Sequence, residues 1–266
     1  MDTWQAIILG LIQGLTEFLP VSSSGHLELA RVFLGVEEGG NLSFVIALHG
    51  ATVLSTIVAL GAEIWQLLRG LFAFRWNWQT EYVVKIVVSM IPVALVGFFL
   101  KDYLDRLFTG NLLLVGSMLL LTALLLWLTG RRVQLYRIRH QPTYSIALGM
   151  GLAQAVAVLP GLSRSGATIA TGILMGFDRP KAARFSFLMV LPPIIGMNLL
   201  DILDGSFSAD SFHALPFWSG VITAFVTGFL ACRWMLSLVR RGRLVWFALY
   251  CALVGGVAIV AAFLNA

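Results

Sequence analysis

Long apolar runs constrain the fold of this chain more than any other feature of its sequence. Each run is long enough to cross a hydrocarbon core of about 30 Å, and together they cover residues 42–66, 82–100, 111–129, 185–203, 214–236 and 244–264. Hydrophobic residues make up 59% of the 266 residues and charged residues only 12%. No water-soluble domain needs so much apolar surface. The sequence therefore predicts an all-α polytopic membrane protein with six transmembrane helices.

Two further apolar segments, residues 3–36 and 143–177, are each interrupted near the middle. The interruptions fall at residues 20–24 and 160–165, and each begins with a proline. The pieces on either side are shorter than a full span requires. Non-helical backbone at membrane depth is tolerated only where it is buried in protein or lines a wet cavity. We therefore expect two re-entrant helix-loop-helix hairpins in addition to the six spans.

The two halves of the chain resemble each other. QGLTEFLPVSSSGH at residues 13–26 has a counterpart, QAVAVLPGLSRSGA, at residues 154–167, and LSFVIALH at 42–49 resembles FSFLMVLP at 185–192. Each half would hold one hairpin and three spans, an odd number, so the second half must be inverted in the membrane. We predict a single integral membrane domain over residues 1–266, built from inverted repeats at about 1–129 and 143–266, with the hairpin tips meeting inside the membrane.

The basic residues predict the orientation of the chain. Although the net charge is +5, these residues lie at the ends of apolar runs, as the positive-inside rule describes, so no nucleic-acid partner is expected. Residues 131–140 carry four arginines, whereas residues 201–210 carry three aspartates and no basic residue. We therefore place residues 67–81, 130–142 and 237–243 in the cytoplasm. Residues 101–110, residues 201–213 and both termini would then lie on the outer side.

Small and polar residues are concentrated at the two hairpin tips. Serine is a preferred helix N-cap, so capping alone would explain any one of these serines. Two helix N-termini that face one cavity would also pool unpaired N–H groups and form an anion site. Glycines would let the backbone approach a phosphate closely. The candidates for anion binding at the tips are Ser22, Ser23, Ser24, Gly25, Gly161, Ser163, Ser165 and Gly166.

Arg164 bears on the choice between helix capping and anion binding. An arginine at the centre of a membrane costs roughly 3 kcal/mol on insertion scales, so it needs a partner at that depth. One alternative is a structural ion pair with Glu17. We favour a phosphate, because a guanidinium between serines and glycines can bind two phosphate oxygens at once.

Glu17 and His26 are the other residues whose burial is costly. A folded hairpin can bring both to the cavity, where such a pair can do acid–base work on a phosphate ester. Glu17 is also an oxygen ligand for a hard cation such as Mg²⁺, and Gln13, one helical turn earlier, can join it as a metal ligand. Ser23 lies between Glu17 and His26 and is the candidate nucleophile, with His26 itself as the rival. The residue pattern leaves these two open.

Other polar residues carry weaker signals. Glu28 and Arg31, at i,i+3 spacing, are predicted to form a local ion pair. His49, His140 and His213 belong to no motif and are assigned no role. The charged residues of 178–184 are interpreted as the membrane boundary after the second hairpin.

At these two motifs the chain resembles the undecaprenyl-diphosphate phosphatase family of bacitracin-resistance proteins. The family's first motif is Glu or Gln, three residues, Glu, and then a Ser-rich loop ending in His; it matches Gln13, Glu17, Ser22, Ser23 and His26. The second motif, Pro-Gly-x-Ser-Arg-Ser-x-x-Thr, matches Pro160, Gly161, Ser163, Arg164, Ser165 and Thr168. The first motif opens with Gln rather than Glu, which would weaken a metal ligand at position 13.

The resemblance implies an enzyme that hydrolyses undecaprenyl diphosphate to undecaprenyl phosphate and inorganic phosphate, and so recycles the lipid carrier for cell-envelope synthesis. It also implies help from Mg²⁺ or Ca²⁺, a homodimer in the bacterial inner membrane, and an active site that opens to the periplasmic or extracellular side. By this analogy Arg164 and the loop from Ser163 to Thr168 hold the diphosphate. Glu17 and His26 handle metal and proton transfer, and Ser23 or His26 attacks.

Two other functions fit parts of the sequence. A transporter or flippase for a phosphorylated polyprenyl lipid would share the inverted repeats and broken helices. Lipid phosphatases of the type-2 phosphatidic acid phosphatase superfamily need a histidine a few residues after a Ser-Arg pair. The next histidine after Ser163 and Arg164 is His213, so that class is disfavoured.

Overall fold

The protein is all-helical in its computed structural model, which describes residues 1–36, 42–100, 112–132, 138–203 and 215–264. Five helical stretches in these residues are long and apolar enough to cross a membrane. They are α5 (Trp78–Phe99), α7 (Leu112–Arg132), α12 (Leu215–Arg240), α13 (Val245–Leu264), and residues 179–200 of α10 (Arg179–Met189) and α11 (Leu191–Leu203). The prediction of a multi-pass helical membrane protein is therefore confirmed. The expected loop at 101–110 falls outside the described residues, as does the loop expected at 201–213 except for residues 201–203, which belong to α11.

The predicted span at residues 42–66 is not one straight helix. It is divided into α3 (Leu42–Ala59) and α4 (Gly61–Leu71), which meet at an angle of 77°. At Leu60 the backbone leaves the helical conformation, with φ −108° and ψ 20°. Beyond the bend α4 carries Glu63, which forms an ion pair with Arg184 of α10 at 2.9 Å. The bent pair counts as a sixth span only if both arms cross the membrane together.

The predicted span at residues 185–203 also begins earlier than expected. Its first helix, α10, starts at Arg179, and a break at Val190 separates it from α11. The charged segment at 178–184, interpreted as a membrane boundary, therefore contributes the first turns of a helix that continues into the apolar region. Hydropathy alone misplaces the start because α10 has many charged residues on its first two turns.

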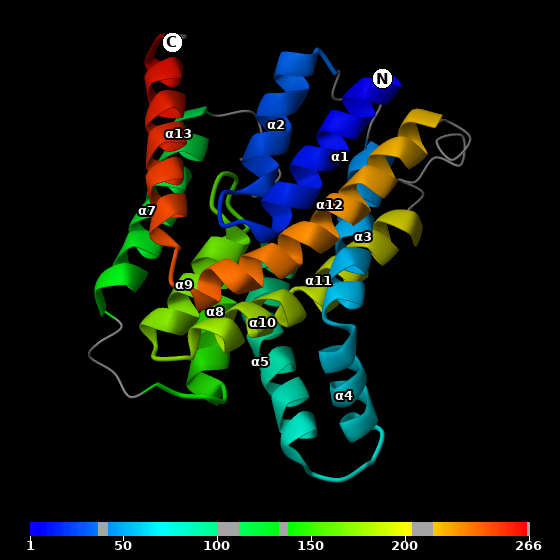
Figure 1. Ribbon diagram of the computed structural model, residues 1–266, viewed down its shortest axis with the longest axis vertical. Helices are drawn as coiled ribbons and strands as arrows, with labels where there is room; N and C mark the ends of the chain where they lie inside the picture. Colours follow the sequence, from blue (N-terminus) through cyan, green and yellow to red (C-terminus); the bar gives the residue numbers. More distant parts are fainter. Residues whose placement is uncertain (37–41, 101–111, 133–137, 204–214, 265–266) are drawn as a thin grey trace.

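The structure contains two helix-loop-helix hairpins whose tips meet. The first is α1 (Thr3–Phe18) with α2 (Ser23–Leu34), and the second is α8 (Tyr144–Val156) with α9 (Arg164–Leu174). Their loops point toward each other (Figure 1). Contact between the tips is direct, because the Ser165 hydroxyl donates a hydrogen bond to the carbonyl oxygen of Leu19 at 3.1 Å. The two expected helix-loop-helix segments and the meeting of their tips are thus found, although the breaks lie at 19–22 and 157–163 rather than at 20–24 and 160–165.

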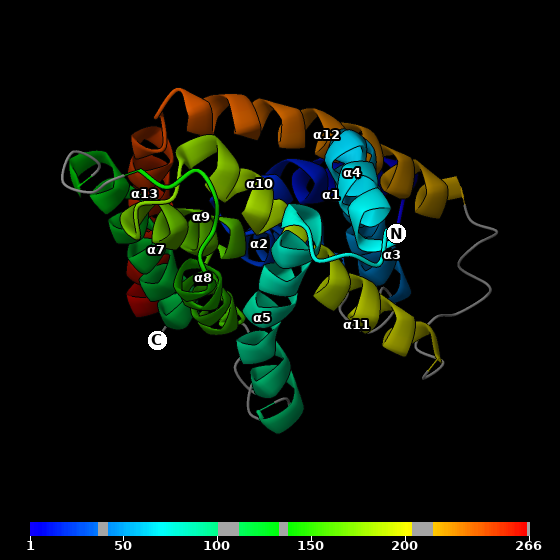
Figure 2. The ribbon, with the colours of Figure 1, turned by 90° about the horizontal axis from the view of Figure 1, so that it is seen from below.

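Glycines fix each hairpin against a long helix. In Figure 2, α12 runs along one edge of the molecule beside α1 and α3, and the contacts also pair α8 with α5 and α7 with α13. A Cβ atom at Gly10 of α1 would lie 2.3 Å from the carbonyl oxygen of Gly220 in α12. A Cβ at Gly151 of α8 would lie 2.3 Å from the carbonyl oxygen of Ser89 in α5. Small residues that allow such close approach are typical of packing between membrane helices.

Candidate functional site

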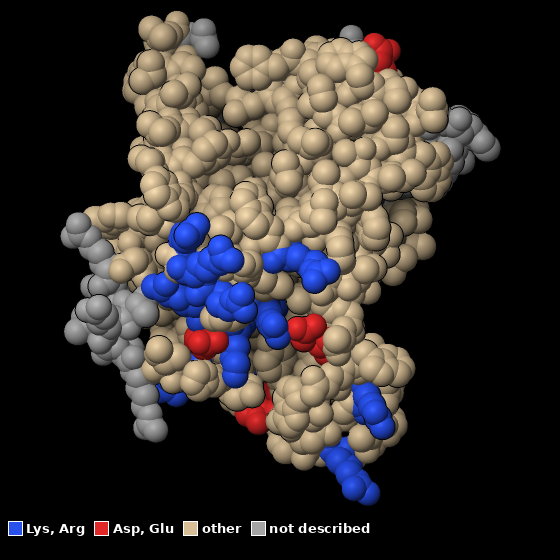
Figure 3. All heavy atoms as spheres, in the orientation of Figure 1, with Lys and Arg blue, Asp and Glu red and all other residues tan. Residues whose placement is uncertain are grey.

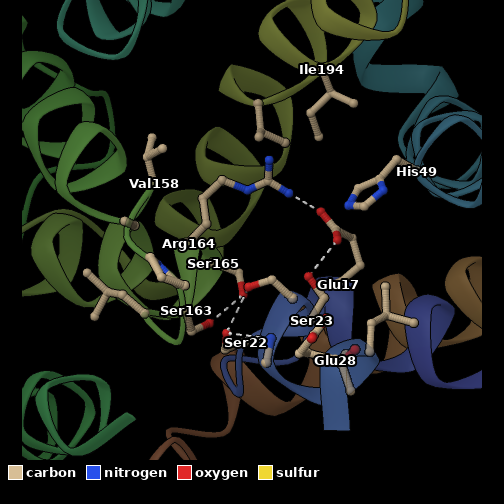
Figure 4. A pocket seen from close by; sticks show the side chains of 18 of the residues that line it. Glu17, Ser22, Ser23, Glu28, His49, Val158, Ser163, Arg164, Ser165 and Ile194 are labelled. Carbon is tan, nitrogen blue, oxygen red and sulfur yellow. Dashed lines mark hydrogen bonds and ion pairs between the residues drawn. The ribbon is translucent and has the colours of Figure 1, made fainter. Parts of the chain in front are cut away.

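A cavity of about 420 Å³ lies where the two hairpin tips meet. Its walls come from both hairpins, from α3, α5, α7 and α11, and from Val190 at the break before α11, and it has a polar end and an apolar remainder. The apolar part is lined by side chains from several helices, among them Val45, Val93, Val115, Ile194 and Met197. Charged and hydroxyl side chains gather at the other end, as Figure 4 shows. The cavity is therefore amphipathic.

Glu17 is the hydrogen-bonding centre of the polar end. Its side chain is 6% exposed. The Ser23 hydroxyl donates to Glu17 Oε2 at 2.9 Å, and the Gln13 side-chain amide donates to the same oxygen at 2.9 Å. The other oxygen, Oε1, accepts from Nη2 of Arg164. Three donors on one buried carboxylate stabilise its ionised form, which can only accept hydrogen bonds.

Arg164 and Glu17 form an ion pair that joins the two hairpins (Figure 4). This is the alternative that the sequence analysis weighed against phosphate binding. The ion pair does not occupy every N–H donor of the guanidinium. The Arg164 side chain is 30% exposed and lines the cavity, while Glu17 is nearly buried. A guanidinium presents five N–H donors, so Arg164 can hold Glu17 and still offer donors to a phosphate. Phosphate binding by Arg164 stays a prediction.

In each hairpin one serine caps the second helix, by a hydrogen bond from a backbone N–H to its hydroxyl. Ser163 is the N-cap of α9, and its hydroxyl accepts from the backbone N–H of Gly166 at 3.1 Å. Ser22 precedes α2, and its hydroxyl accepts from the N–H of Gly25 at 3.4 Å. Ser22 holds φ of 71°, a left-handed backbone that is strained for a residue other than glycine. Helix capping, the simpler interpretation of these serines, is therefore present at both tips.

Most of the predicted site residues line the cavity. They are Glu17, Ser22, Ser23, Ser24, Gly25, Ser163, Arg164 and Ser165. The cavity wall does not include Gln13, His26, Gly161, Gly166 or Thr168. Gly161 has φ of +91°, and a Cβ there would lie 2.6 Å from the carbonyl oxygen of Val115, so its contact is with α7. Thr168 instead bonds Ser186 of α10 through their hydroxyls at 2.6 Å.

His26 lies away from Glu17. Its Nδ1 bonds the carbonyl oxygen of Ser22 at 2.8 Å, and its Nε2 bonds the hydroxyl of Tyr250 in α13 at 2.6 Å. The two rings stack at 5.7 Å between centroids. The expectation that the hairpin brings both Glu17 and His26 to the cavity is met for Glu17 only. His26 instead turns toward α13, where Tyr250 bonds and stacks against its ring.

Among the cavity residues that no sequence motif assigned to the site are His49 and Gln154. His49 of α3 lines the cavity, and in Figure 4 its ring faces the carboxylate of Glu17. Its Nδ1 bonds the Val45 carbonyl oxygen at 3.0 Å. Gln154 of α8 also lines the cavity, and it is the repeat counterpart of Gln13. The internal repeat was a signal that could have identified Gln154, whereas no motif marks His49.

Glu17, at the polar end, and Gln13, buried behind it, carry oxygen atoms that suit a hard cation. Gln13 is fully buried and its side-chain carbonyl oxygen has no hydrogen-bond partner, while its amide nitrogen contacts Glu17. An unpaired buried amide oxygen next to a carboxylate is the donor type that Mg²⁺ and Ca²⁺ prefer. In the described residues no group of three or more His, Cys, Asp or Glu side chains could hold a metal ion. Mg²⁺ commonly uses only one or two carboxylates with water and substrate phosphates, so these residues fit such an ion.

The fold and this site define a multi-pass helical membrane protein with an amphipathic cavity where two helix-loop-helix hairpins meet. The profile of the family described as "Bacitracin resistance protein BacA" matches residues 6–257, so the chain belongs to that family. A protein of Bacteroides fragilis named undecaprenyl-diphosphatase is 51% identical over 263 residues, covering 98% of each chain. Proteins of the same name from Christiangramia forsetii and Desulforapulum autotrophicum are 48% and 40% identical, and 99% of each chain is covered in both comparisons.

Proposed function

We propose that this protein is an undecaprenyl-diphosphatase, which hydrolyses undecaprenyl diphosphate to undecaprenyl phosphate and inorganic phosphate. The activity recycles the lipid carrier used in cell-envelope synthesis. Full-length relatives at about half identity carry that name. The observation on the chain itself that carries the proposal is Arg164 at the wall of an amphipathic cavity, bonded to Glu17, which in turn accepts from a serine hydroxyl.

The cavity matches the two chemical parts of a prenyl diphosphate. Arg164, Ser163 and Ser165 lie together at the polar end, where they would contact the diphosphate. The apolar walls would take the first isoprene units, because transfer of apolar surface out of water is favourable. A polyprenyl chain is far longer than this cavity, so the rest of the chain would extend into the surrounding lipid.

The contacts of Ser23 favour it over His26 as the nucleophile. Its hydroxyl lies within hydrogen-bond distance of Glu17, the nearest base, and it lines the cavity, whereas His26 bonds Tyr250 outside it. In the proposed sequence Glu17 accepts the Ser23 proton as Oγ bonds to the terminal phosphorus. The bond from that phosphorus to the bridging oxygen breaks, and undecaprenyl phosphate leaves. Water then hydrolyses the phosphoserine, which releases inorganic phosphate and restores the hydroxyl.

A divalent cation is part of the proposal, with Glu17 and Gln13 as its protein ligands. When bound, such an ion would neutralise charge on the diphosphate and polarise its oxygens. With purified protein and a long-chain isoprenyl diphosphate, we expect phosphate release in Mg²⁺ and loss of that release in EDTA. Restoring Mg²⁺ or Ca²⁺ should restore the rate. Release that continues at its full rate in EDTA would contradict the role of the metal ion. No release under any condition would contradict the proposed hydrolase activity.

His49 is a second candidate for the histidine that acts in the site. It lines the cavity beside Glu17, and the bond from its Nδ1 to the carbonyl oxygen of Val45 holds the ring at the cavity wall, where an imidazole can act as an acid–base group. We expect His49→Ala to lower kcat by roughly 10²-fold, the lower range for a positioned acid–base group. His26→Phe, which keeps a ring against Tyr250, should reduce kcat much less. Steady-state kinetics of both variants test this order. A larger loss of kcat in His26→Phe would indicate that His26, not His49, is the histidine that acts in the site.

The inverted repeat is the architecture that best accounts for the packing. Gly10 and Gly151 hold equivalent positions, each three residues before a glutamine, and each approaches a backbone carbonyl of a long helix. By the same repeat relation, the packing of α1 against α12 corresponds to the packing of α8 against α5. The proposal therefore includes repeats at about 1–129 and 143–266, six spans and two re-entrant hairpins. It also includes a cavity that opens to the periplasmic or extracellular side of the bacterial inner membrane, and the homodimer implied by the family resemblance.

A further inference from the structure

Basic side chains from three separate parts of the chain gather on one face of the molecule (Figure 3). We call this group the basic patch and define it as Arg139, Arg179, Lys181, Arg240, Arg241 and Arg243. None of these residues lines the cavity. In the described part of the chain none of them forms a salt bridge, and the nearby carboxylates are Asp178 and Glu63, the latter already paired with Arg184. The patch therefore carries a large uncompensated positive charge.

Backbone and side-chain contacts hold the three segments together. Arg139 forms an isolated bridge with Phe177, in which the N–H of Arg139 donates to Gly176 and the N–H of Asp178 donates to Arg139. The Lys181 ammonium donates to the carbonyl oxygen of His140 at 2.7 Å. The patch is thus a defined surface of the fold, in which segments distant in sequence are fixed side by side.

The turn between α12 and α13 completes the patch. Gly242 has φ of +69°, and a Cβ there would lie 2.1 Å from Nη1 of Arg179, so the guanidinium of Arg179 packs against this turn. Arg240, Arg241 and Arg243 flank the glycine and are exposed. Because Gly242 leaves room for Arg179, the turn brings that guanidinium together with Arg240, Arg241 and Arg243, although like charges repel.

The position of the patch identifies the ligand class. Two candidate membrane spans, α12 and α13, end at this turn, so the turn lies at the level of the lipid headgroups. Trp234 and Trp246, on either side of it, are 52% and 66% exposed, and tryptophan is enriched at membrane interfaces. A ligand here must therefore be negatively charged and located at the membrane surface. We propose that the basic patch is a binding site for the headgroups of anionic phospholipids, separate from the substrate cavity.

The test uses the full-length protein in detergent and measures lipid binding by native mass spectrometry. Phosphatidylglycerol should bind more tightly than phosphatidylcholine with the same acyl chains, because only the former carries net negative charge. Each basic residue near an anionic surface changes binding by about fivefold. The triple variant Arg240→Gln, Arg241→Gln, Arg243→Gln should therefore lower phosphatidylglycerol binding at least about tenfold. Higher salt should weaken binding to the unchanged protein.

Matched controls separate this site from general charge effects. The variant Arg69→Gln, Arg75→Gln removes exposed basic residues near the α4–α5 turn and should leave binding unchanged. The triple variant Arg240→Lys, Arg241→Lys, Arg243→Lys should retain most binding, which would show that the region tolerates substitution. The proposal is overturned if the triple glutamine variant binds phosphatidylglycerol normally, or if both lipids bind equally. Displacement of the lipid by millimolar inorganic phosphate would instead indicate a free-anion site and would also overturn it.

Discussion

Replacing Arg164 with alanine is expected to reduce phosphate release by roughly 10²- to 10³-fold, the range for loss of one preorganised donor to a transition-state charge. Arg164 is the basic side chain that the cavity presents beside Ser163 and Ser165, at the polar end. The loss should appear mainly in kcat/KM, because the guanidinium contacts the diphosphate in both the bound substrate and the transition state. Steady-state kinetics with purified protein measure it directly.

A loss of fold must be distinguished from a loss of chemistry in that variant. Arg164 is the ionic partner of Glu17, and removing one partner of a buried pair costs about 3–5 kcal/mol in stability. Arg164→Lys keeps the charge beside Glu17 but cannot bind two phosphate oxygens in one plane. We expect it to unfold near the wild-type temperature and still to lose at least tenfold in rate, as for loss of a bidentate contact worth about 1.4 kcal/mol or more.

A second ion pair supplies the control for this experiment. Arg184→Gln breaks the pair with Glu63, which lies at the bend between α3 and α4 and does not line the cavity. Its activity should stay within about twofold, since surface pairs of this kind contribute little. Near-normal activity in a folded Arg164→Lys would contradict a phosphate role for this arginine and would leave it as a structural bridge between the hairpins.

The elements that the sequence predicted well are those set by local pattern. The spans α5, α7, α12 and α13 follow from uninterrupted apolar runs, and both hairpins follow from a proline and serines between two shorter runs. The bend at Leu60 was missed because residues on both sides of it are apolar, so hydropathy records no interruption. Beyond the bend α4 packs against α5, and Glu63 pairs with Arg184 of α10, a contact that spans more than 100 residues of sequence.

In the candidate site, too, some residues are predicted by local sequence pattern and others are placed only by the tertiary fold. Glu17, Ser23 and Arg164 were predicted because the repeat places their segments at facing tips, and the structure brings them into one hydrogen-bonded group. The position of His26 could not be read from its spacing, since a helix that starts at Ser23 turns it toward Tyr250. His49 lies on an ordinary apolar helix with no motif around it. Only the tertiary arrangement of α3 against the hairpins shows that its ring reaches the cavity.

Ser23→Ala should cause the other large loss, at least roughly 10³-fold in kcat, because a nucleophile has no substitute when its oxygen is removed. The hydroxyl donates to Glu17, which keeps its bonds to Gln13 and Arg164 when Ser23 is replaced, so the variant should fold. Ser117→Ala is the matched control. That hydroxyl donates to the carbonyl oxygen of Leu113 in its own helix and does not line the cavity, so activity should be unchanged.

Trapping the covalent intermediate decides which residue attacks. Rapid acid quenching with substrate labelled at its terminal phosphorus should leave label on the protein if Ser23 is the nucleophile, because phosphoserine is stable in acid. Phosphohistidine is lost in acid and kept in alkali, so the opposite stability would assign the attack to a histidine. Ser23→Ala should abolish the acid-stable label and Glu17→Gln should slow its formation, since Glu17 is the base that bonds the hydroxyl. Label that persists in Ser23→Ala would remove Ser23 from the mechanism while leaving Arg164 and the cavity in place.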